Sequence, residues 1–324
     1  MFKRILVPLD GSELAENALT PAMAIAERYG SEVILLRAVQ ITPMVMSDPI
    51  GGGYVWPEET LDTLAKNAAL YLVDIASREM KETFSLKTEV AQTDPASAII
   101  DVATEQAVDL IVMTTHGYSG VTRWVLGSVT ERVLRYAPCP VYAVRSAEIP
   151  SHILIPLDGS KLAETMLEPA ITLAKGFNAK ITFTRVDDPN DRPDGELYDA
   201  ISEYDPSLAE SYKDAFYHRS LDYLERIKAQ YEAFDVPMGV DIGQGKSAER
   251  IIAVAERNGC DLIAMSTHGR TGMRRWRYGS VTERVLRNTE RAMLVARPSD
   301  EVFDSIHIEA SDLEMKRQID RRIA

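Results

Sequence analysis

Residues 2–16 read FKRILVPLDGSELAE, and residues 150–164 read PSHILIPLDGSKLAE, an offset of 148. Further along, THGYSGVTRWVLGSVTERVLR at 115–135 is matched by THGRTGMRRWRYGSVTERVLR at 267–287, an offset of 152. Self-similarity of this kind is the signature of a repeated structural unit. The chain of 324 residues therefore contains two copies of one module, here called copy one and copy two.

Within each copy, short apolar runs alternate with longer segments of helical periodicity, which is the pattern of βαβ units around a mainly parallel sheet. In copy one this pattern predicts strands near 3–9, 32–39, 86–91, 109–115 and 140–145. The helices between them are expected near 12–29, 59–82, 95–106 and 128–137. Copy two repeats the strands near 152–157, 179–186, 236–242, 261–266 and 292–297. The predicted fold class is α/β, with two tandem doubly wound parallel-sheet domains of the Rossmann-like kind.

These patterns place the first domain at 1–147 and the second at 148–298. Residues 299–324 have no counterpart in copy one, and their apolar residues at every fourth position predict a short amphipathic helix. Two long segments, Gln40 to Pro57 and Asp187 to Asp205, follow the second strand of each copy. Long loops in compact domains are often functional, so we expect these two to lie over a site.

The composition excludes several classes of partner. A net charge of −13 disfavours nucleic-acid binding, which depends on Lys and Arg neutralising phosphates. The two cysteines, Cys139 and Cys260, form neither a disulfide framework nor a metal-binding CxxC, which indicates a reducing compartment. The first residues lack the pattern of a signal peptide, and no apolar run reaches the length of a membrane span. We therefore expect a cytoplasmic protein with neither nucleic acid nor membrane as a partner.

The first repeated motif, Leu-Asp-Gly-Ser, comes where a buried strand stops and a helix starts. Its aspartates, Asp10 and Asp158, allow two interpretations. In the structural one, Ser12 or Ser160 caps the helix and the helix dipole favours the carboxylate. In the functional one, each aspartate lies at the carboxyl edge of a parallel sheet, where doubly wound folds bind ligands and a carboxylate accepts hydrogen bonds from ribose hydroxyls. This motif alone favours the structural interpretation.

The second repeated motif places a glycine directly before a helix. Nine residues lie between Gly117 and Gly127, and nine lie between Gly269 and Gly279. A glycine at this position lets backbone N–H groups approach a phosphate closely, and the helix dipole attracts negative charge. The motif therefore predicts an anion site in each copy.

A capping box is the alternative explanation of this motif. In it, Ser128 or Ser280 would bond the third amide of the helix, and Glu131 or Glu283 would bond back. A capping box does not account for the paired glycines, nor for the arginines between the glycines of copy two. These candidate phosphate partners are Arg270, Arg274, Arg275 and Arg277. Copy one has only Arg123 there, so copy two is expected to be the better anion site.

The remaining polar residues do not indicate a catalytic centre. His116 and His268 each precede a motif glycine, and they either contact a phosphate or tie the turn together, the second interpretation being favoured. No Ser-His-Asp order, metal-spaced cluster or GxxxxGK[ST] loop occurs in the sequence.

Together the two motifs resemble those of the universal stress protein family, and the resemblance covers residues 2–298. Nucleotide-binding members of that family have a glycine, two residues, a glycine, nine residues, a glycine and then Ser or Thr, with an aspartate at the end of the first strand. Thr114 and Ser266 stand where the first of these glycines is expected. A side chain there would crowd the ribose or the phosphates, although a small hydroxyl can also donate a hydrogen bond.

The resemblance implies a site in each copy for an adenine nucleotide, with ATP and Mg²⁺ as the cofactors. In copy one its members would be Pro8, Leu9, Asp10, Ala38, Thr114, His116, Gly117, Gly127, Ser128 and Val129. In copy two they would be Pro156, Leu157, Asp158, Val186, Ser266, His268, Gly269, Arg270, Gly279, Ser280 and Val281. The aspartates would face the ribose, the ends of the second strands the adenine, and the glycine motif the phosphates. The family fold is adenine nucleotide alpha hydrolase-like, and its sheet order 3-2-1-4-5 would put both motifs at one crevice.

The resemblance also implies pairing through the fifth strands, so that 140–145 and 292–297 would form a pseudo-dimer within one chain, and two chains a homodimer. The predicted function is an ATP-binding protein of stress response or signalling, in which the nucleotide biases conformation or partner choice and any hydrolysis is slow. One alternative is a nucleotide-free scaffold of the same fold. The other is a nucleotide hydrolase, which the missing acid/base cluster disfavours.

Overall fold

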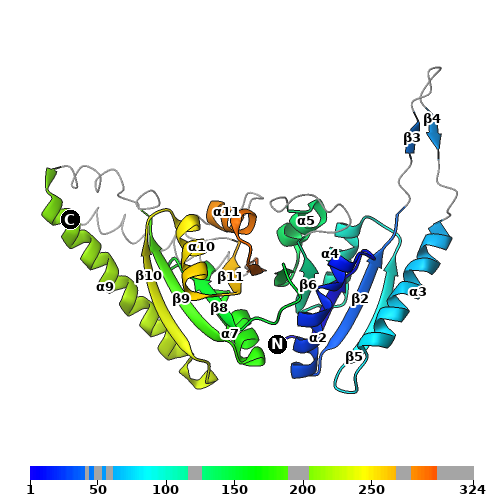
Figure 1. Cartoon of the computed structure of the whole chain (residues 1–324), viewed down its shortest axis with the longest axis horizontal. Coiled ribbons are helices and arrows are strands. Elements are labelled where there is room, and N and C mark those ends of the chain that lie inside the picture. Colours follow the sequence, from blue (N-terminus) through cyan, green and yellow to red (C-terminus); the bar gives the residue numbers. More distant parts are fainter. Residues whose placement is uncertain are drawn as a thin grey trace, which may run out of the picture. The chain divides into compact units, whose positions relative to one another are not determined.

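The computed structural model describes residues 1–40, 61–115, 126–188, 204–267 and 279–297, together with two short strands at 44–46 and 53–55. The chain divides into two compact units, Met1–Ile149 and Pro150–Ala324. Unit one contains copy one, and unit two contains copy two (Figure 1). The helix predicted within 299–324 lies outside the described residues.

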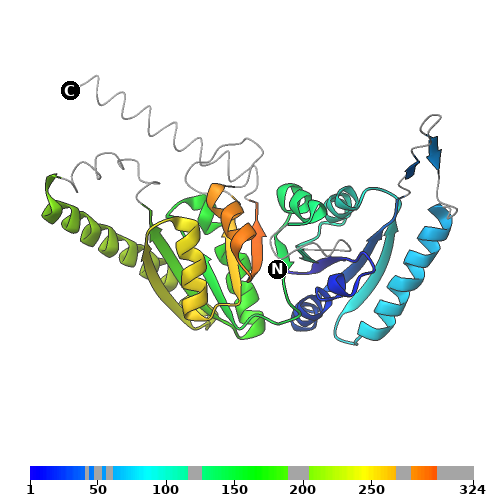
Figure 2. The same cartoon turned by 45° about the horizontal axis from the view of Figure 1, so that its top comes forward.

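The sheet of unit one consists of parallel strands covered by helices. In spatial order the strands are β5 (Ser85–Ala91), β2 (Glu32–Ala38), β1 (Arg4–Pro8), β6 (Leu110–Thr114) and β7 (Val141–Val144). The helices are α1 (Glu13–Glu16), α2 (Leu19–Tyr29), α3 (Leu61–Glu79), α4 (Pro95–Glu105) and α5 (Ser128–Tyr136). Figure 2 shows α2 and α3 on one face of this sheet and α4 and α5 on the other.

Unit two repeats this arrangement. In spatial order its strands are β10 (Met238–Gln244), β9 (Lys180–Asp187), β8 (His152–Pro156), β11 (Leu262–Ser266) and β12 (Ala292–Ala296). Its helices are α6 (Lys161–Glu164), α7 (Leu167–Phe177), α9 (Pro206–Gln230), α10 (Ser247–Asn258) and α11 (Ser280–Asn288), with a short 3₁₀ helix, η2, at Glu232–Phe234. Numbered along each copy, both sheets have the order 3-2-1-4-5. The predicted doubly wound α/β fold is therefore confirmed.

The central strands are apolar along their length because helices cover both faces of the sheet. In β1, Ile5, Leu6 and Val7 have no exposed surface. The core thus fixes β1 beside β6, with Leu6 opposite Ile111. The strand order reverses between these two strands, and doubly wound folds bind ligands at the carboxyl edge of such a point.

The helix predicted at 12–29 is divided into α1 and α2. At the division, the N–H of Asn17 donates to the carbonyl oxygen of Leu14 at 3.2 Å and that of Ala18 to Ala15 at 3.1 Å, which is the 3₁₀ pattern. Pro21 explains the break, because it has no N–H to donate to the carbonyl of residue 17. Pro169 has the same place in unit two, where α6 and α7 are divided in the same way.

The segment from Gln40 to Pro57, predicted as a loop, contains the antiparallel pair β3 (Met44–Met46) and β4 (Gly53–Val55). Within the described ranges, no helix combines the length and the apolar composition needed to cross a membrane.

Candidate functional site

The turn that follows the first strand of each copy, here called the LDGS turn, has the same geometry in both units. In unit one, Oδ1 of Asp10 accepts hydrogen bonds from the backbone N–H of Ser12 at 2.9 Å and from its hydroxyl at 2.6 Å. The hydroxyl oxygen of Ser12 accepts from the N–H of Ala15 at 3.1 Å and so caps α1. Asp158 and Ser160 make the corresponding bonds at 2.8, 2.6 and 3.1 Å. The helix-entry interpretation is confirmed in both copies, and the serine fixes the orientation of the carboxylate.

Gly127 and Gly279 hold the start of the next helix against the end of the fourth strand. The N–H of Gly127 donates to the carbonyl oxygen of Thr115 at 3.1 Å, and a Cβ at this glycine would lie 3.2 Å from the same oxygen. The N–H of Gly279 donates to the carbonyl oxygen of Thr267 at 2.6 Å. A side chain at Gly127 would therefore crowd the strand end that the helix must approach.

The capping-box interpretation of this motif is wrong. Gly127 occupies the cap position in an extended conformation, so that Ser128 becomes the first residue of α5 and its hydroxyl lies past the cap. No side chain of the described residues caps α5. Glu131 pairs instead with Arg135 one turn later, at 2.9 Å.

The same correction applies to α11. Gly279 occupies its cap position without a side-chain hydrogen bond, and Glu283 pairs with Arg287 at 3.1 Å. The first turn of a helix leaves backbone N–H groups without partners inside the helix, and they attract anions when no side chain caps them. In the part of the chain that the structure describes, α5 and α11 both start in this way.

Thr114 and Ser266, which replace the expected first glycine, belong to the joint between strand and helix. The hydroxyl of Thr130 donates to the carbonyl oxygen of Thr114 at 3.1 Å. In unit two the hydroxyl of Thr282 donates to the carbonyl oxygen of Ser266 at 2.9 Å. The helix that starts at the glycine is thus tied through its first turn to the end of the fourth strand.

The structure brings the predicted site residues of each copy to one edge of the sheet, where the strands end. The N–H of Leu9 donates to the carbonyl oxygen of Leu36 at 2.8 Å and carries the LDGS turn towards the end of β2. In unit one this edge holds Pro8, Leu9, Asp10, Ala38, Thr114, Gly127, Ser128 and Val129. In unit two it holds Pro156, Leu157, Asp158, Val186, Ser266, Gly279, Ser280 and Val281. The other predicted residues lie outside the described ones: His116, Gly117, Arg123, His268, Gly269, Arg270, Arg274, Arg275 and Arg277.

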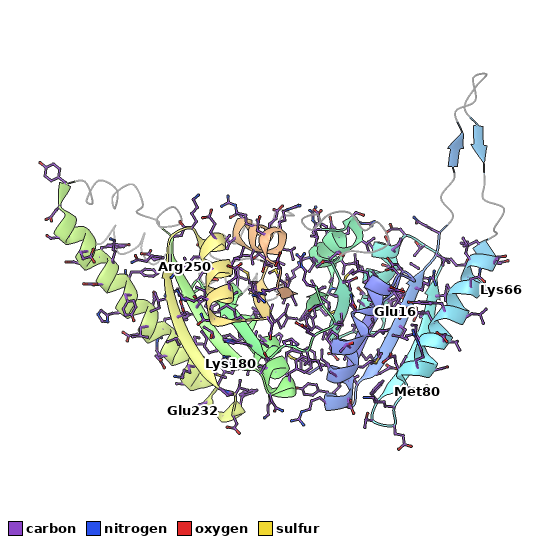
Figure 3. All side chains as sticks on the ribbon, viewed as in Figure 1. Glu16, Lys66, Met80, Lys180, Glu232 and Arg250 are labelled. Carbon is purple, nitrogen blue, oxygen red and sulfur yellow. The ribbon has the colours of Figure 1, made fainter. Side chains whose placement is uncertain are left out.

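A cluster that the sequence did not predict lies against the LDGS turn of unit one. A Cβ built on Gly11 would lie 2.8 Å from Nη2 of Arg37. The guanidinium carbon of Arg37 is 4.7 Å from the centre of the Tyr71 ring, and the Tyr71 hydroxyl donates to Oε1 of Glu16 at 3.1 Å. Glu16 ends α1 on the α3 side of the unit (Figure 3). Burial and the Glu16 carboxylate raise the pKa of Tyr71, which keeps the phenol a hydrogen-bond donor. We call Arg37, Tyr71 and Glu16 the clamp of copy one.

Unit two contains the same clamp. A Cβ built on Gly159 would lie 3.3 Å from Nη2 of Arg185. The guanidinium carbon of Arg185 lies 5.2 Å from the Tyr223 ring centre and 5.4 Å from that of Phe216. The Tyr223 hydroxyl donates to Oε1 of Glu164 at 3.0 Å. Arg185, Tyr223 and Glu164 form the clamp of copy two.

The clamp of copy two borders an open groove of about 1130 Å³ between the LDGS turn and α9. Its walls contain both arginines and carboxylates and are formed by Asp158, Gly159, Ser160, Arg185, Arg219, Asp222, Tyr223, Glu225, Arg226 and Ala229. A signal for the clamp was present in the sequence. Tyr71-Leu72 and Ile75 recur as Tyr223-Leu224 and Ile227 at the same offset of 152 as the second motif.

Comparisons with known proteins identify the family of the chain. The model of the universal stress protein family matches residues 1–145 and again 150–297. A universal stress protein of Methanocaldococcus jannaschii is 34% identical over 147 residues, which are 45% of this chain and 83% of that protein. A universal stress protein of Mycolicibacterium smegmatis is 24% identical over 304 residues, which are 91% of this chain and 97% of that protein.

The fold of a solved structure is similar over nearly the whole chain. The crystal structure of a universal stress protein from Archaeoglobus fulgidus superposes with a TM-score of 0.65 at 22% identity, covering 92% of this chain and 100% of that one. At this identity the likeness concerns the fold. With two matches of the family model that together span most of its length, the chain belongs to the universal stress protein family and carries the family module in tandem.

Proposed function

We propose that the protein is an ATP-binding universal stress protein, in which each copy holds an adenine nucleotide with Mg²⁺ and nucleotide occupancy biases conformation or partner choice. The observation that carries the proposal is the arrangement of the sheet edge. In both copies an oriented carboxylate, Asp10 or Asp158, follows the first strand, and a helix start without a side-chain cap follows the neighbouring fourth strand.

The residues at this edge suit the parts of a nucleotide. Backbone N–H groups at the start of α5 and α11 suit the phosphates, because the helix dipole adds positive potential there. Asp10 and Asp158 suit the ribose, because an ionised carboxylate accepts hydrogen bonds from hydroxyls. The backbones of Ala38 and Val186, at the ends of the second strands, would face the adenine. The magnesium ion would supply charge neutralisation at the phosphates when bound.

A nucleotide-free scaffold is the second candidate, and one observation favours it. Thr114 and Ser266 put side chains where nucleotide-binding relatives have glycine, and Ser266 is buried. In this case the same turns and helix starts would only stabilise the fold. The two candidates make opposite predictions about bound nucleotide.

The test uses the purified full-length chain. We expect acid denaturation to release adenine nucleotide and calorimetry on stripped protein to show binding of ATP in the presence of Mg²⁺. The matched control is the double variant Gly127→Val, Gly279→Val, which crowds both helix starts and should bind none. Absence of released nucleotide together with absence of calorimetric binding in the parent protein would establish the scaffold instead.

Pairing of the two fifth strands, assembly of two chains and a cytoplasmic location stay predictions. So does slow hydrolysis of ATP.

A further inference from the structure

We infer that Arg37 and Arg185 are positioning residues, which fix the LDGS turn so that Asp10 and Asp158 present their carboxylates to the ribose of the nucleotide. The inference rests on the proposed nucleotide site and adds to it one arginine from the second strand of each copy. It also assigns a role to the clamp, which neither motif contains.

The contact with the turn is the first step. Gly11 has φ +87° and Gly159 φ +88°, a region that L side chains rarely adopt. The guanidinium of Arg37 fills the space beside Gly11, since a Cβ there would lie 2.8 Å from Nη2, 3.0 Å from Cζ and 3.1 Å from Nη1. The arginine therefore lies flat against the residue that directly follows Asp10, and any rotation of this peptide would have to displace it.

The rigidity of the arginine is the second step. An exposed arginine samples many rotamers, but Arg37 stacks on the Tyr71 ring at 4.7 Å, a contact that attracts a cation to the ring face. Tyr71 is itself held by its hydrogen bond to Glu16, and Arg78 donates to the other oxygen of Glu16 at 3.1 Å. In copy two Arg185 lies near two rings instead of one, those of Phe216 and Tyr223.

The repetition of the clamp is the third step. The helices that carry it differ in length, 19 residues in α3 and 25 in α9, and their outer faces differ in chemistry. Leu70 and Val73 are exposed on α3, whereas the matching positions of α9 are Asp222 and Glu225. The arginine, tyrosine and glutamate are nevertheless the same in both copies. If these three side chains only stabilised the surface around them, the same three residues would not be required in both copies.

The experiment measures how strongly the ribose hydroxyls contribute to binding. Affinities for ATP and for 2′,3′-dideoxy-ATP, each with Mg²⁺, are measured by calorimetry in the Gly279→Val background, where copy one is the remaining site. We expect the parent to prefer ATP by roughly 10- to 150-fold, because a hydrogen bond to a charged group contributes about 1.5–3 kcal/mol and each factor of ten in affinity corresponds to about 1.4 kcal/mol. In Arg37→Met this preference should fall to about one, with the affinity for the dideoxy nucleotide unchanged.

Matched variants separate positioning from general stability. Arg78→Met removes an arginine that contacts Glu16 but not Gly11, and it should keep the preference. Tyr71→Phe retains the ring beneath Arg37, so the preference for ATP should be unchanged. Tyr71→Leu removes the ring and should reduce the preference. Asp10→Asn is the positive control and should lose it. Circular dichroism melting shows which variants are folded, and if Arg37→Met is not, Arg185→Met in the Gly127→Val background gives the same measurement in copy two.

Two negative results have different meanings. If the parent prefers ATP and a folded Arg37→Met or Arg185→Met variant prefers it equally, the positioning role is overturned while the proposed function stands. If the parent binds neither nucleotide, the proposed function fails and the inference fails with it.

Discussion

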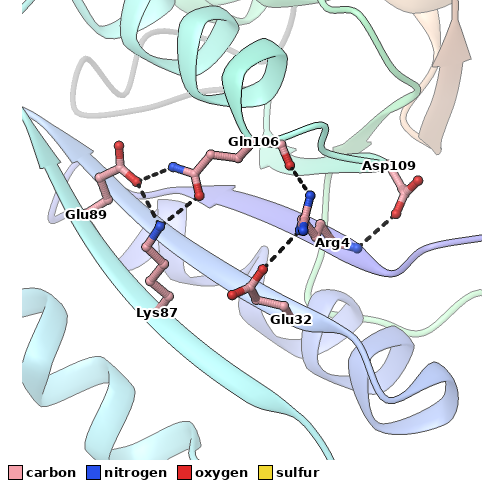
Figure 4. Close-up of polar contacts among 6 residues, drawn as sticks. All are labelled: Arg4, Glu32, Lys87, Glu89, Gln106 and Asp109. Carbon is pink, nitrogen blue, oxygen red and sulfur yellow. Dashed lines mark hydrogen bonds and ion pairs between the residues drawn. The ribbon is translucent and has the colours of Figure 1, made fainter.

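The two copies anchor the amino end of their first strand in the same way but complete the contact with different side chains. In copy one the backbone N–H of Arg4 donates to Oδ2 of Asp109 at 2.9 Å, and Nη1 of Arg4 donates to the carbonyl oxygen of Gln106 at 2.7 Å (Figure 4). The guanidinium also pairs with Glu32 at 3.2 Å. The Arg4 side chain is 47% exposed, so this network lies in contact with solvent.

In copy two the corresponding side chain is His152, which is only 4% exposed. Its backbone N–H donates to Oδ1 of Asp261 at 3.1 Å, and its Nδ1 lies 3.0 Å from the carbonyl oxygen of Asn258. Because a carbonyl can only accept, Nδ1 carries the proton of the neutral ring, and Nε2 accepts from the hydroxyl of Thr182 at 2.8 Å. Burial, and secondarily the charge of Lys180, lowers the pKa of His152. Lys180, labelled in Figure 3, is the first residue of β9.

The difference shows which part of the contact the fold requires. In both copies an aspartate binds the backbone of the first strand. In both, a side chain of that strand also donates to the carbonyl oxygen at the end of the helix that precedes the fourth strand. A permanent charge is not required. An exposed arginine is charged throughout the physiological pH range and is screened by water, whereas a buried imidazole is favoured in its neutral form. At this position copy two couples its stability to pH through His152.

The largest effect is expected on nucleotide binding, at the carboxyl edge of each sheet where the second motif lies. We expect Gly279→Val to remove most nucleotide binding and Gly127→Val to remove less, because copy two has more arginines in its second motif. The altered site should show no detectable binding, because a valine side chain crowds the helix start that would hold the phosphates. Calorimetric titration of each single variant with ATP and Mg²⁺ measures it. Equal losses in the two variants would contradict the ranking of the copies.

Most of the fold followed from the sequence because its central strands are buried on both faces. The residues at 5–7 and 110–113 are continuous apolar runs, and the repeat supplies each of them twice. The break between α1 and α2 was missed because the apolar pattern runs on through Pro21, which lies well inside the predicted helix 12–29. In the structure Pro21 lies in the first turn of α2, where a proline is tolerated. The antiparallel pair β3 and β4 was missed because its strands have three residues each, too few for a periodic signal.

The site was predicted in part, for a physical reason. Asp10 and Gly127 belong to local motifs, and the parallel sheet brings the ends of their strands together. The capping-box alternative fails because Gly127, packed against Thr115, occupies the cap position itself, which the local sequence does not show. The clamp depends on Arg37 meeting Tyr71, a contact between two elements that are distant in sequence.

The second prediction tests the buried contact of copy two. Thr182→Val removes the hydroxyl that binds Nε2 of His152 and leaves a buried ring nitrogen without a partner, which should lower the free energy of unfolding by about 1–3 kcal/mol. The matched control is Thr184→Val on the same strand, since the buried Thr184 hydroxyl has no partner among the described residues and its loss should be neutral or stabilising. Urea unfolding followed by circular dichroism measures both. Equal decreases in the free energy of unfolding of the two variants would contradict a stabilising hydrogen bond between Thr182 and His152.

The third prediction concerns pH. The folded protein holds the pKa of His152 below its ordinary value of 6.5, so protonation favours the unfolded state. The stability contributed by the neutral ring is complete above about pH 6.5 and is lost as the pH falls through that value towards the lower pKa of the folded state. Urea unfolding from pH 8 to pH 5 should therefore show a smaller acid loss in His152→Gln than in the parent protein. An identical slope in both would show that His152 does not titrate on unfolding.

The smallest effect is expected at the exposed network of copy one. Glu32→Gln removes the partner of Arg4 in an ion pair whose side chains are 47% and 40% exposed. Such pairs contribute about 0–1 kcal/mol, because water screens them and both side chains lose freedom when they pair. The change in the free energy of unfolding should stay below about 1 kcal/mol and shrink further in 1 M salt. A loss as large as that of Thr182→Val would mean that Arg4 depends on Glu32 for its bond to Gln106, and the exposed network would then be as cooperative as the buried one.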